Sequence, residues 1–333
     1  MRIAINGFGR IGRLVFRIME DEFKDLEVVA INDLGDPKQL AYLLKYDTNH
    51  GNYKIDEISY DDENIIIGSK KIKVYKEMNP ENLPWKDLKI DIVFECTGHF
   101  TSVDTAMSHI KAGAGHVIVS APCKGDLKTI VYNVNHHTLD GSEKIISAAS
   151  CTTNCLAPVL DIIDKNIGID YGFMTTVHAY TNDQATLDVS HTKGIESRRG
   201  RACAANIIPA TTGAASAIGE VIPSLKGKMK GMAMRVPVPT GSIIDLVLKV
   251  RKKVSATEIN QLFESHQNET IKITYDPIVS SDIISSSYGS IVDGLSTDVL
   301  EDGNLLKIVA WYDNEMGYSY QMVRTAAYFA SKE

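Results

Sequence analysis

The stretch RIAINGFGRIGR, residues 2–13, begins as a short apolar strand and runs into three glycines spaced as GxGxxG. Apolar residues then continue at helical spacing, at Ile11, Leu14, Val15, Ile18 and Met19. A second apolar run, 28–31, ends at Asn32-Asp33, so a carboxylate stands about 20 residues after the third glycine. Strand, glycines, helix and acid in this order predict a βαβ unit that binds a dinucleotide.

Each residue type in this unit suits a contact with a dinucleotide. Gly7, Gly9 and Gly12 permit a tight turn and a close approach of the backbone to the pyrophosphate, which faces the helix start. Asp33 can accept hydrogen bonds from the ribose hydroxyls and would repel a 2′-phosphate. A glycine-rich turn in an α/β protein without a nucleotide is the alternative interpretation.

Three further apolar runs, at 90–95, 116–120 and 129–132, extend the pattern toward residue 150. Nearly continuous apolar strands are typical of a parallel sheet covered on both faces, so we predict a Rossmann-type, doubly wound domain over 1–150. The carboxyl ends of such strands line the ligand crevice, although small polar residues also end strands with no ligand nearby. This rule adds three cofactor-side candidates: Thr97, Gly98 and Ser120.

The pattern changes in the second half, where runs at 173–177, 243–250 and 271–275 often alternate between apolar and polar residues. Alternation is typical of antiparallel strands with one solvated face. Asp302-Gly303 is a hairpin signal. We therefore predict an α/β chain whose second domain, 151–314, is α+β with a mainly antiparallel sheet.

Three other segments of this half have distinct patterns. A helix is predicted to begin at Ser255, where Glu258 completes a capping box. Residues 180–202 are too polar to pack as an ordinary element, and loops of that length are usually functional or disordered. The arginine cluster inside it is either a solvated turn or an anion site. The stretch from Met322 on predicts a final amphipathic helix.

The segment Ser150-Cys151-Thr152-Thr153-Asn154-Cys155 places a thiol where an apolar strand, 144–149, is predicted to turn into a helix. Ser150 suits the N-cap. The N–H groups and dipole of a helix start favour a thiolate, which makes Cys151 a candidate nucleophile, whereas a small apolar residue of the core is the alternative. Pro158 should kink this helix or confine its regular part to the residues after it.

Composition excludes several classes of protein. The 333 residues are 44% hydrophobic and 23% charged, which is typical of a globular chain with room for two domains. A net charge of −7 argues against nucleic acid or an anionic membrane as the main partner. A basic leader and an apolar run of membrane-spanning length are both missing from the sequence, so we expect a cytoplasmic protein.

The five cysteines are odd in number and form no CxxC pair, so neither a disulfide framework nor a metal site is predicted. Cys151 and Cys155 are one helical turn apart. Their oxidation to a disulfide, as in a redox sensor, remains an alternative role.

Six segments, in order along nearly the whole chain, closely resemble the phosphorylating glyceraldehyde-3-phosphate dehydrogenases. They are INGFGRIGR (5–13), LLKYDTNHG (43–51), ASCTTNC (149–155), HAYTNDQ (178–184), GMAMRVPVPT (231–240) and WYDNEMGYS (311–319). The resemblance implies oxidation of glyceraldehyde 3-phosphate with NAD and inorganic phosphate to 1,3-bisphosphoglycerate, in glycolysis or gluconeogenesis.

The resemblance also implies roles for residues. Cys151 is the implied nucleophile and His178 its partner, which as an imidazolium would stabilise the thiolate and as a base would take the hydroxyl proton of the hemithioacetal. Thr181 and Arg235 would hold the substrate phosphate. The implied ligands of the incoming phosphate are Ser150, Thr152, Arg199, Thr212 and Gly213.

On the cofactor side, the family implies contacts from residues of both halves: Arg10, Ile11, Asp33, Met78, Ser120, Asn314 and Tyr318. It also implies that the last helix, 315–333, packs back on the nucleotide domain. The family assembles as a homotetramer in which a long polar loop, here 180–202, reaches a neighbouring cofactor site.

One departure bears on cofactor choice. Val189-Ser190 replaces the Leu-Pro usual in strictly NAD-using members, so we expect NAD preference with some use of NADP. Erythrose-4-phosphate dehydrogenase, a homologue that hydrolyses its thioester, is the enzymatic alternative. That family tends to lose the threonine after HAY and the Thr-Gly pair at 212–213, and both are present here. A non-catalytic paralogue that senses oxidants or binds a partner is the other alternative.

Overall fold

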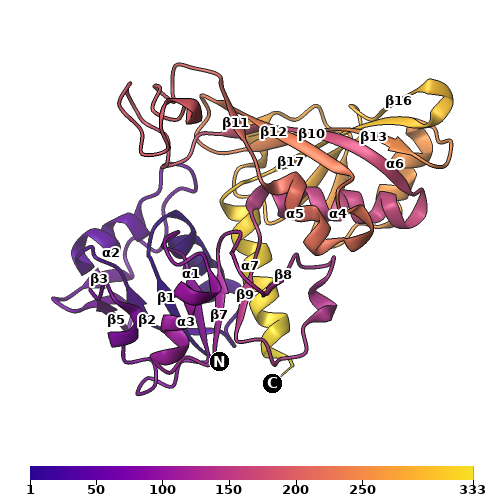
Figure 1. The fold of residues 1–333 in the computed structure, drawn as a ribbon. Coiled ribbons are helices and arrows are strands. Elements are labelled where there is room, and N and C mark those ends of the chain that lie inside the picture. Colours follow the sequence, from indigo (N-terminus) through magenta and orange to yellow (C-terminus); the bar gives the residue numbers. More distant parts are fainter. Residues whose placement is uncertain (333) are drawn as a thin grey trace. The chain divides into compact units, whose positions relative to one another are not determined.

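The computed structural model describes residues 1–332 and divides into two compact units (Figure 1). Unit 1 comprises Met1–Tyr132, His136–Ala149 and the chain from Ser319 on. Unit 2 comprises Asn133–Asn135 and Ser150–Tyr318.

The sheet of unit 1 has the strand order β3-β4-β5-β2-β1-β6-β7-β9-β8. Its strands are β1 (Arg2–Asn6), β2 (Glu27–Asn32), β3 (Ile58–Tyr60), β4 (Asn64–Ile67), β5 (Lys70–Tyr75), β6 (Ile92–Glu95), β7 (His116–Val119), β8 (Lys128–Thr129) and β9 (Ile145–Ser147). All neighbours from β5 to β8 pair in parallel, while β3, β4 and β5 pair antiparallel at one edge. The Rossmann-type parallel sheet is confirmed, and the strands β3 to β5 are an addition that the sequence patterns did not indicate.

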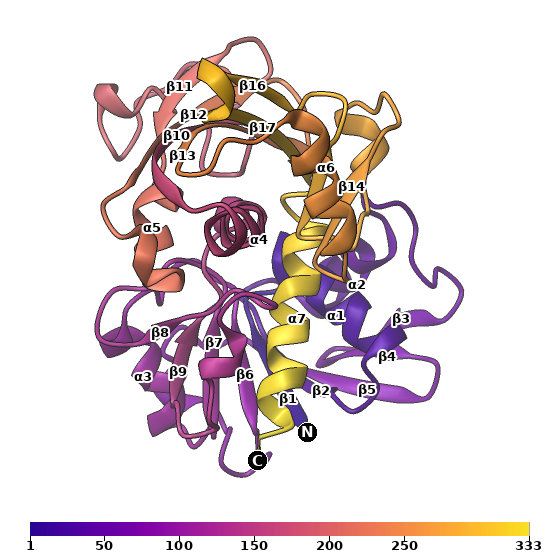
Figure 2. The same cartoon turned by 90° about the vertical axis from the view of Figure 1, so that its right-hand side faces the viewer.

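Helices cover both faces of this sheet. They are α1 (Arg10–Glu22), α2 (Pro37–Lys45), α3 (Val103–Lys111) and α7 (Met316–Ala330), with Glu333 of the predicted 315–333 helix lying outside the described residues. Alternate residues of β1, β6 and β7 pack in one cluster with Ala106 of α3. On the other face Ile5 lies beside Gly12 of α1, and the Phe329 ring of α7 lies 4.8 Å from that of His116. Figure 2 shows the ribbons of α1 and α7 beside the strands of this sheet. Burial on both sides explains the continuous apolar runs.

The sheet of unit 2 has the order β11-β12-β10-β13-β17-β15-β14, with β16 paired to β17. Its strands are β10 (Ile169–Ala179), β11 (Ile208–Thr211), β12 (Met229–Val236), β13 (Ser242–Val250), β14 (Ile271–Thr274), β15 (Ser290–Asp293), β16 (Asp298–Leu300) and β17 (Leu305–Tyr312). The pairs β10·β12 and β14·β15 are parallel, and the other pairs in the described chain are antiparallel. The predicted, mainly antiparallel sheet is therefore confirmed.

Local turn and cap signals of this unit are realised as predicted. The hairpin between β16 and β17 turns through Asp302 and Gly303, whose φ values are 55° and 94°. Helix α6 (Ala256–Ser265) begins with the capping box of Ser255 and Glu258. Residues 180–202 carry only the short 3-10 helix η3 (Ile195–Ser197) in the described structure. The other 3-10 helices are η1 (Pro80–Asn82), η2 (His136–Thr138), η4 (Pro223–Leu225), η5 (Ser280–Ile283) and η6 (Glu301–Gly303).

Helix α4 (Cys151–Asn166) runs through Pro158, so of the two expectations at this proline, a kink or a regular helix only after it, the second is wrong. Pro158 removes one helical N–H donor, but the helix is buried on several sides, including Leu156, Val159 and Leu160. Packing against α5 (Ala214–Val221), β15 and β17 therefore outweighs the loss of one hydrogen bond. Figure 1 shows α4 and α5 along one face of the unit 2 sheet. No helix within residues 1–332 has both the length and the apolar content to cross a membrane.

Two glycines of the first turn should respond differently to a methyl group. A Cβ on Gly12 would lie 2.1 Å from the carbonyl oxygen of Gly7, whereas a Cβ on Gly9 would meet no atom within 4 Å. We expect Gly12→Ala to destabilise the fold by about 1–3 kcal/mol, the usual cost of overpacking, and Gly9→Ala to melt like the wild type. Thermal unfolding of both variants measures this, and equal Tm values would contradict the packing of α1 on β1.

Candidate active site

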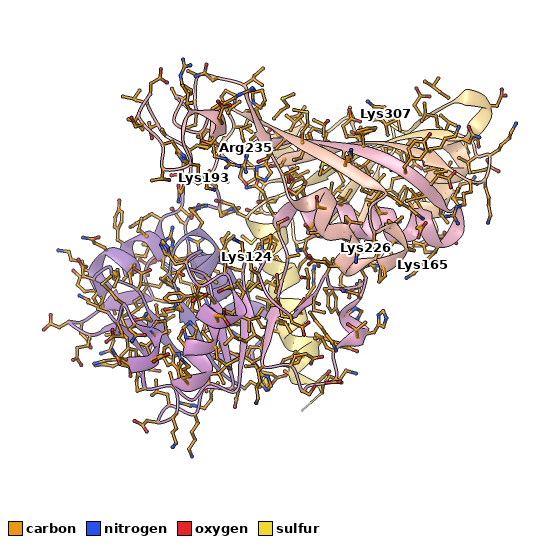
Figure 3. All side chains as sticks on the ribbon, viewed as in Figure 1. Lys124, Lys165, Lys193, Lys226, Arg235 and Lys307 are labelled. Carbon is orange, nitrogen blue, oxygen red and sulfur yellow. The ribbon has the colours of Figure 1, made fainter. Side chains whose placement is uncertain are left out.

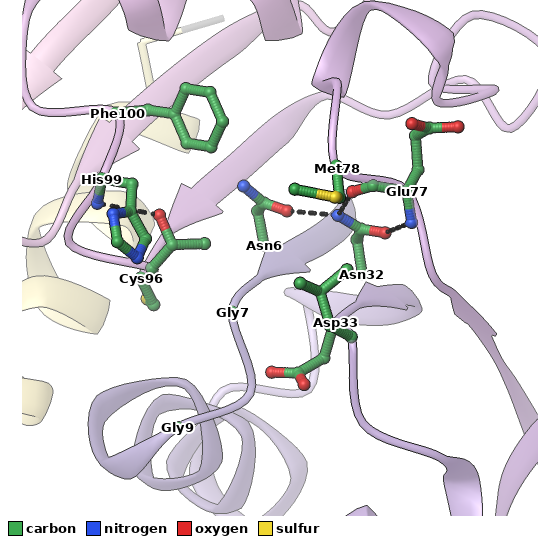
Figure 4. Close-up of a pocket in the computed structure, with 12 residues that line it drawn as sticks. Asn6, Gly7, Gly9, Asn32, Asp33, Glu77, Met78, Cys96, His99 and Phe100 are labelled. Atoms are coloured by element: carbon green, nitrogen blue, oxygen red, sulfur yellow. Dashed lines mark hydrogen bonds between the residues drawn. The ribbon is translucent and has the colours of Figure 1, made fainter.

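A cavity of about 500 Å³ opens at the carboxyl ends of the unit 1 strands (Figure 4). Five of the predicted cofactor residues line it: Gly7, Gly9, Asp33, Met78 and Thr97. It lies where the sheet order changes direction, because β1 is flanked by β2 on one side and β6 on the other. Doubly wound sheets bind their ligands at such a switch point.

The carboxylate of Asp33 is held in the cavity wall by backbone donors. Its oxygens accept hydrogen bonds from the N–H groups of Phe8 at 2.7 Å and Gly35 at 2.8 Å. Each oxygen has two lone pairs, so one remains on each for a ribose hydroxyl. The same bonds fix the glycine turn to the end of β2.

The glycine turn has the open shape that a dinucleotide requires. Gly7 has a φ of 91°, and a Cβ there would lie 2.7 Å from the Thr97 nitrogen. The space beside Gly9 contains no atom that a Cβ would meet, so the backbone is open to a ligand. Cavity, open backbone and ribose-facing acid together fit a dinucleotide.

Several predicted cofactor residues are not part of the cavity wall. Gly12 packs against Gly7, and Ile11 is in the first turn of α1. The Arg10 guanidinium is bound to both oxygens of Asp47, with Nη2 3.0 Å from Oδ1. Burial would raise the pKa of Asp47, but bonds from Arg10 and two backbone N–H groups outweigh it and lower the pKa to about 2. The Arg10 side chain is therefore committed to this ion pair.

Two other predicted cofactor residues of unit 1 also lie outside the wall. Gly98 follows Thr97 with a φ of 74°. Ser120 is hydrogen-bonded to the thiol of Cys96, and burial raises the pKa of that thiol far above its usual value. Cys96 is accordingly an unreactive wall residue.

The wall includes residues that the sequence analysis missed: Asn6, Asn32, Leu34, Glu77, Cys96, His99 and Phe100. The rule that selected Thr97 would also have found Asn6 and Asn32, because both end parallel strands. Asn32 donates to Asn6 Oδ1 at 2.7 Å and bonds the backbone of Glu77 in both directions (Figure 4). His99 and Phe100 had no comparable local signal.

In unit 2, Cys151 is the first residue of α4, after a left-handed Ala149 with a φ of 58°. Ser150 is the N-cap, as predicted, and its hydroxyl accepts from the Thr153 N–H at 3.1 Å. The thiol thus lies at a helix start and faces the end of β10, where Cys151 Sγ is 3.4 Å from His178 Nε2. The predicted pair of cysteine and histidine is brought together.

The neighbours of His178 fix its tautomer. Its Nδ1 lies 2.7 Å from the Ala179 carbonyl, which can only accept, and 3.1 Å from Arg235 Nη1, which can only donate. Arg235 Nη1 has two other acceptors, and the contact with the carbonyl is the shorter, so the proton is assigned to Nδ1 and the lone pair to Nε2, beside the thiol. The fully buried Tyr312 packs edge-on against the ring, with centroids 5.8 Å apart. Tyr312 also bonds the hydroxyls of Thr152 at 3.0 Å and Thr176 at 2.8 Å. The sequence analysis missed Tyr312, although it lies inside the motif at 311–319.

Burial controls the charge of this pair. It raises the pKa of the Cys151 thiol, against an opposing effect of the Arg235 charge. Burial, aided by Arg235, lowers the pKa of His178 to about 3. Desolvation therefore favours a neutral thiol beside a neutral imidazole, in place of the imidazolium expected from the family resemblance.

Arg235, near the end of β12, connects this pair to a chain of polar side chains (Figure 3). Its Nη1 donates to the Ala179 carbonyl at 3.0 Å and to Thr181 Oγ1 at 3.1 Å. The Thr181 hydroxyl in turn donates to Asp183, which also accepts from Arg199. Arg235 Nε is buried and has no partner among the described residues, so the guanidinium retains a donor. Arg199 and Thr181 thus bond one carboxylate, and Arg235 is linked to it through Thr181.

The other predicted phosphate ligands are engaged in local bonds. The Thr152 hydroxyl is buried against Tyr312, and Thr212 Oγ1 accepts from the Ala214 N–H at 3.2 Å. Gly213 is the N-cap of α5. In the described structure, the hydrogen bond of Thr212 is to Ala214, and it does not connect Thr212 to Arg199 or Arg235.

Two predicted cofactor residues belong to unit 2. Asn314 Oδ1 accepts from the Gly241 N–H at 3.1 Å and from the hydroxyls of Ser242 and Thr240 at 2.9 and 3.4 Å. These bonds assign the oxygen to the protein side and orient the amide NH₂. Tyr318 is buried in the last segment of the unit.

Comparisons with known proteins show the family of the chain. Residues 1–103 match the model of the glyceraldehyde 3-phosphate dehydrogenase NAD binding domain, and 150–314 match that of the C-terminal domain. The chain is 54% identical over 331 residues to a glyceraldehyde-3-phosphate dehydrogenase of Clostridium acetobutylicum, covering 99% of this chain and 98% of the relative. A Clostridium pasteurianum enzyme of that name is 53% identical with the same coverage, and one from Streptococcus pyogenes is 50% identical over 333 residues, again covering 99% and 98%. The resemblance seen in the motifs is confirmed, and the chain belongs to the glyceraldehyde-3-phosphate dehydrogenase family.

Proposed function

We propose that this NAD-dependent oxidoreductase converts D-glyceraldehyde 3-phosphate and inorganic phosphate to 1,3-bisphosphoglycerate through a thioester on Cys151. The contact between Cys151 Sγ and His178 Nε2 beside Arg235 carries the proposal. It combines a nucleophile, a base with a free lone pair and a cation suited to a phosphate.

His178 would act twice as a proton acceptor. As Sγ attacks the aldehyde carbon, Nε2 takes the thiol proton and returns it to the new oxyanion, which gives a hemithioacetal. Nε2 then takes the hydroxyl proton while the carbon loses a hydride, and the thioester results. NAD, when bound, supplies the hydride acceptor. Attack by phosphate breaks the S–C bond, and the imidazolium returns its proton to Sγ.

Substrate anions would raise the basicity of His178. Arg235 is one cause of its low pKa, after burial. A phosphate bound to Arg235 and Thr181 would offset that positive charge and raise the pKa of His178. The buried Nε of Arg235, which lacks a partner among the described residues, supports an anion here. We assign the substrate phosphate to Thr181 and Arg235.

The second anion site is proposed from chemistry and family resemblance. Its residues are Ser150, Thr152, Arg199, Thr212 and Gly213. Arg199 supplies charge, while Gly213 at the start of α5 supplies a backbone N–H. Thr152 and Ser150 would have to exchange their present bonds for the phosphate, because one bonds Tyr312 and the other caps α4.

The cofactor would span contacts from both halves of the chain. We propose NAD as the preferred form, since Asp33 would repel a 2′-phosphate, with some use of NADP. In unit 1 the proposed contacts are Gly7, Gly9, Arg10, Ile11, Gly12, Asp33, Met78, Thr97, Gly98 and Ser120. In unit 2, Asn314 would donate its NH₂ to the carboxamide, and Tyr318 would pack behind the ring.

We further propose that 1–150 with the last helix forms the nucleotide domain and 151–314 the catalytic domain. The two compact units support this division, because the chain from Ser319 on belongs to unit 1. A cytoplasmic location fits the free cysteines described in residues 1–332.

A homotetramer is proposed as the assembled state. One face of the unit 2 sheet exposes Tyr171, Phe173, Met232 and Val247, with Phe173 and Val247 directly paired across β10 and β13. The 180–202 loop adds exposed Leu187, Val189 and Ile195. Contiguous exposed apolar surface of this kind usually marks an interface.

Phosphate should determine the product. If phosphate attacks the thioester, omitting it should stop steady-state NADH formation after about one turnover per site, because the acyl-enzyme accumulates. Stopped-flow absorbance of NADH with and without phosphate measures this, with Cys151→Ala as the inactive control. Steady turnover without phosphate would instead favour a hydrolysing enzyme such as erythrose-4-phosphate dehydrogenase.

Arg235 should matter chiefly for substrates that carry a phosphate. Arg235→Lys keeps the charge but loses the planar donors, and we expect kcat/KM for glyceraldehyde 3-phosphate to fall by about 10- to 100-fold. Unphosphorylated glyceraldehyde is the internal control, and its kcat/KM should change much less. Equal losses for both aldehydes would argue against a phosphate at Arg235.

Asp33 should determine the choice between cofactors. We expect kcat/KM to be higher for NAD than for NADP in the wild type, and the ratio to fall by about tenfold in Asp33→Ser, which removes the charge that repels a 2′-phosphate. Steady-state kinetics with both cofactors at saturating aldehyde and phosphate give the ratio. Equal or NADP-favouring values in the wild type would refute the proposed preference.

A further inference from the structure

A buried carboxylate lies beneath the cofactor cavity and has no role in the chemistry above. Glu95 is the last residue of β6 and is fully buried. Its Oε1 accepts from both the N–H, at 2.8 Å, and the hydroxyl of Thr97. Its Oε2 accepts from Asn6 Nδ2 at 2.5 Å and lies 3.0 Å from His109 Nε2. The side chain thus joins the ends of β1 and β6 at the switch point.

These contacts assign the ionised form to Glu95. The backbone N–H of Thr97 and the amide of Asn6 can only donate, and Asn6 Oδ1 is already bound to Asn32. Four donor groups therefore surround two oxygens, which suits a carboxylate that accepts only. Of these groups only the Thr97 hydroxyl could accept a proton from the acid, and it already accepts from the His99 N–H at 3.1 Å, whereas the ionised form gives every donor an acceptor.

His109 does not neutralise this charge. The indole N–H of Trp85, which can only donate, points at His109 Nδ1 over 3.1 Å. Nδ1 must therefore be unprotonated, and the single ring proton lies on Nε2, where it faces Glu95. The ring is therefore neutral. The other groups that donate hydrogen bonds to Glu95 within residues 1–332, from Asn6 and Thr97, are neutral as well. The carboxylate keeps its full negative charge in a site of low polarity.

The charge lies on the side of the cavity opposite the ribose-binding acid. Asp33 ends the β2 side, where a doubly wound fold holds the adenosine half of a dinucleotide. Glu95 ends β6, on the other side of β1, where the second nucleotide half extends. Its direct partners Asn6 and Thr97 are themselves cavity wall. The field of Glu95 therefore acts mainly on the nicotinamide half.

We propose that the buried, unneutralised Glu95 carboxylate makes the cofactor pocket favour the oxidised, cationic dinucleotide over the reduced one. The inference rests on the proposed function only in that the pocket holds a nicotinamide cofactor. The two forms share the same pyrophosphate, so its repulsion by Glu95 affects both equally. They differ by one positive charge on the ring, which the carboxylate attracts. The pocket then holds the oxidant firmly and releases the reduced product readily.

The test measures the dissociation constants of NAD⁺ and NADH by isothermal titration calorimetry. All variants carry Cys151→Ser, so that no charge on that thiol contributes. We expect Kd(NADH)/Kd(NAD⁺) to exceed one in Cys151→Ser and to fall by about three- to tenfold on adding Glu95→Gln, as expected for one charge at an effective dielectric constant near 20. Glu95→Asp keeps the charge but shortens the reach, so both Kd values should rise while the ratio stays high.

Glu77→Gln is the matched control. It removes a carboxylate from the cavity wall near β2, where its Oε1 bonds only the local Asn79 N–H in the described structure. Its Kd ratio should equal that of Cys151→Ser. The proposal is overturned if Glu95→Gln leaves the Kd ratio unchanged. It is also overturned if Cys151→Ser binds NADH as tightly as NAD⁺, and this second measurement can be made even if the Glu95 variants do not fold. Failure of both cofactors to bind would refute the proposed function instead.

Discussion

Gly7 brings the ends of β1 and β6 into direct backbone contact, and much of unit 1 follows from that contact. Gly7 has a φ of 91° and turns the chain away from the sheet. A Cβ at this position would lie only 2.7 Å from the Thr97 nitrogen. Only glycine tolerates both conditions. The close approach lets the Cys96 N–H reach the Asn6 carbonyl at 2.7 Å and places Glu95 under Asn6. The cavity wall and the buried carboxylate are therefore consequences of one missing methyl group.

Burial and charge are balanced differently in the two units. In unit 1, Glu95 is buried with its charge intact because four hydrogen bonds replace its hydration. In unit 2, Cys151 and His178 have few such partners, so desolvation drives both toward their neutral forms. A bound anion changes that balance only in unit 2, since Arg235 stands beside His178. The first site has a fixed charge, and in the proposed mechanism the second acquires charge during the reaction.

Features set by local residue patterns could be predicted from the sequence. The GxGxxG turn, the capping box at Ser255 and the hairpin at Asp302-Gly303 each depend on residues close together in the chain. The edge strands β3 to β5 were missed because they are short and only partly buried.

Features that depend on distant partners escaped prediction. Arg10 is bound to Asp47, and His109 to Trp85, through contacts that no spacing rule encodes. The burial that lowers the pKa of His178 could not be read from the sequence, because burial is a tertiary property. For the same reason, the motif around Cys151 identified the thiol but not the tyrosine that packs behind its base.

The division of unit 1 between the two ends of the chain constrains how it can form during synthesis. Its sheet is complete by residue 149, yet Phe329, which packs on His116 of β7, is made only after unit 2. The part of this sheet face around β7, which α7 covers, must therefore wait, uncovered, while unit 2 is translated. At about 5–20 residues per second, the roughly 170 intervening residues take on the order of ten seconds or more. During that interval the nascent chain exposes an apolar surface that a chaperone could bind and that truncation near the C-terminus would leave permanently bare.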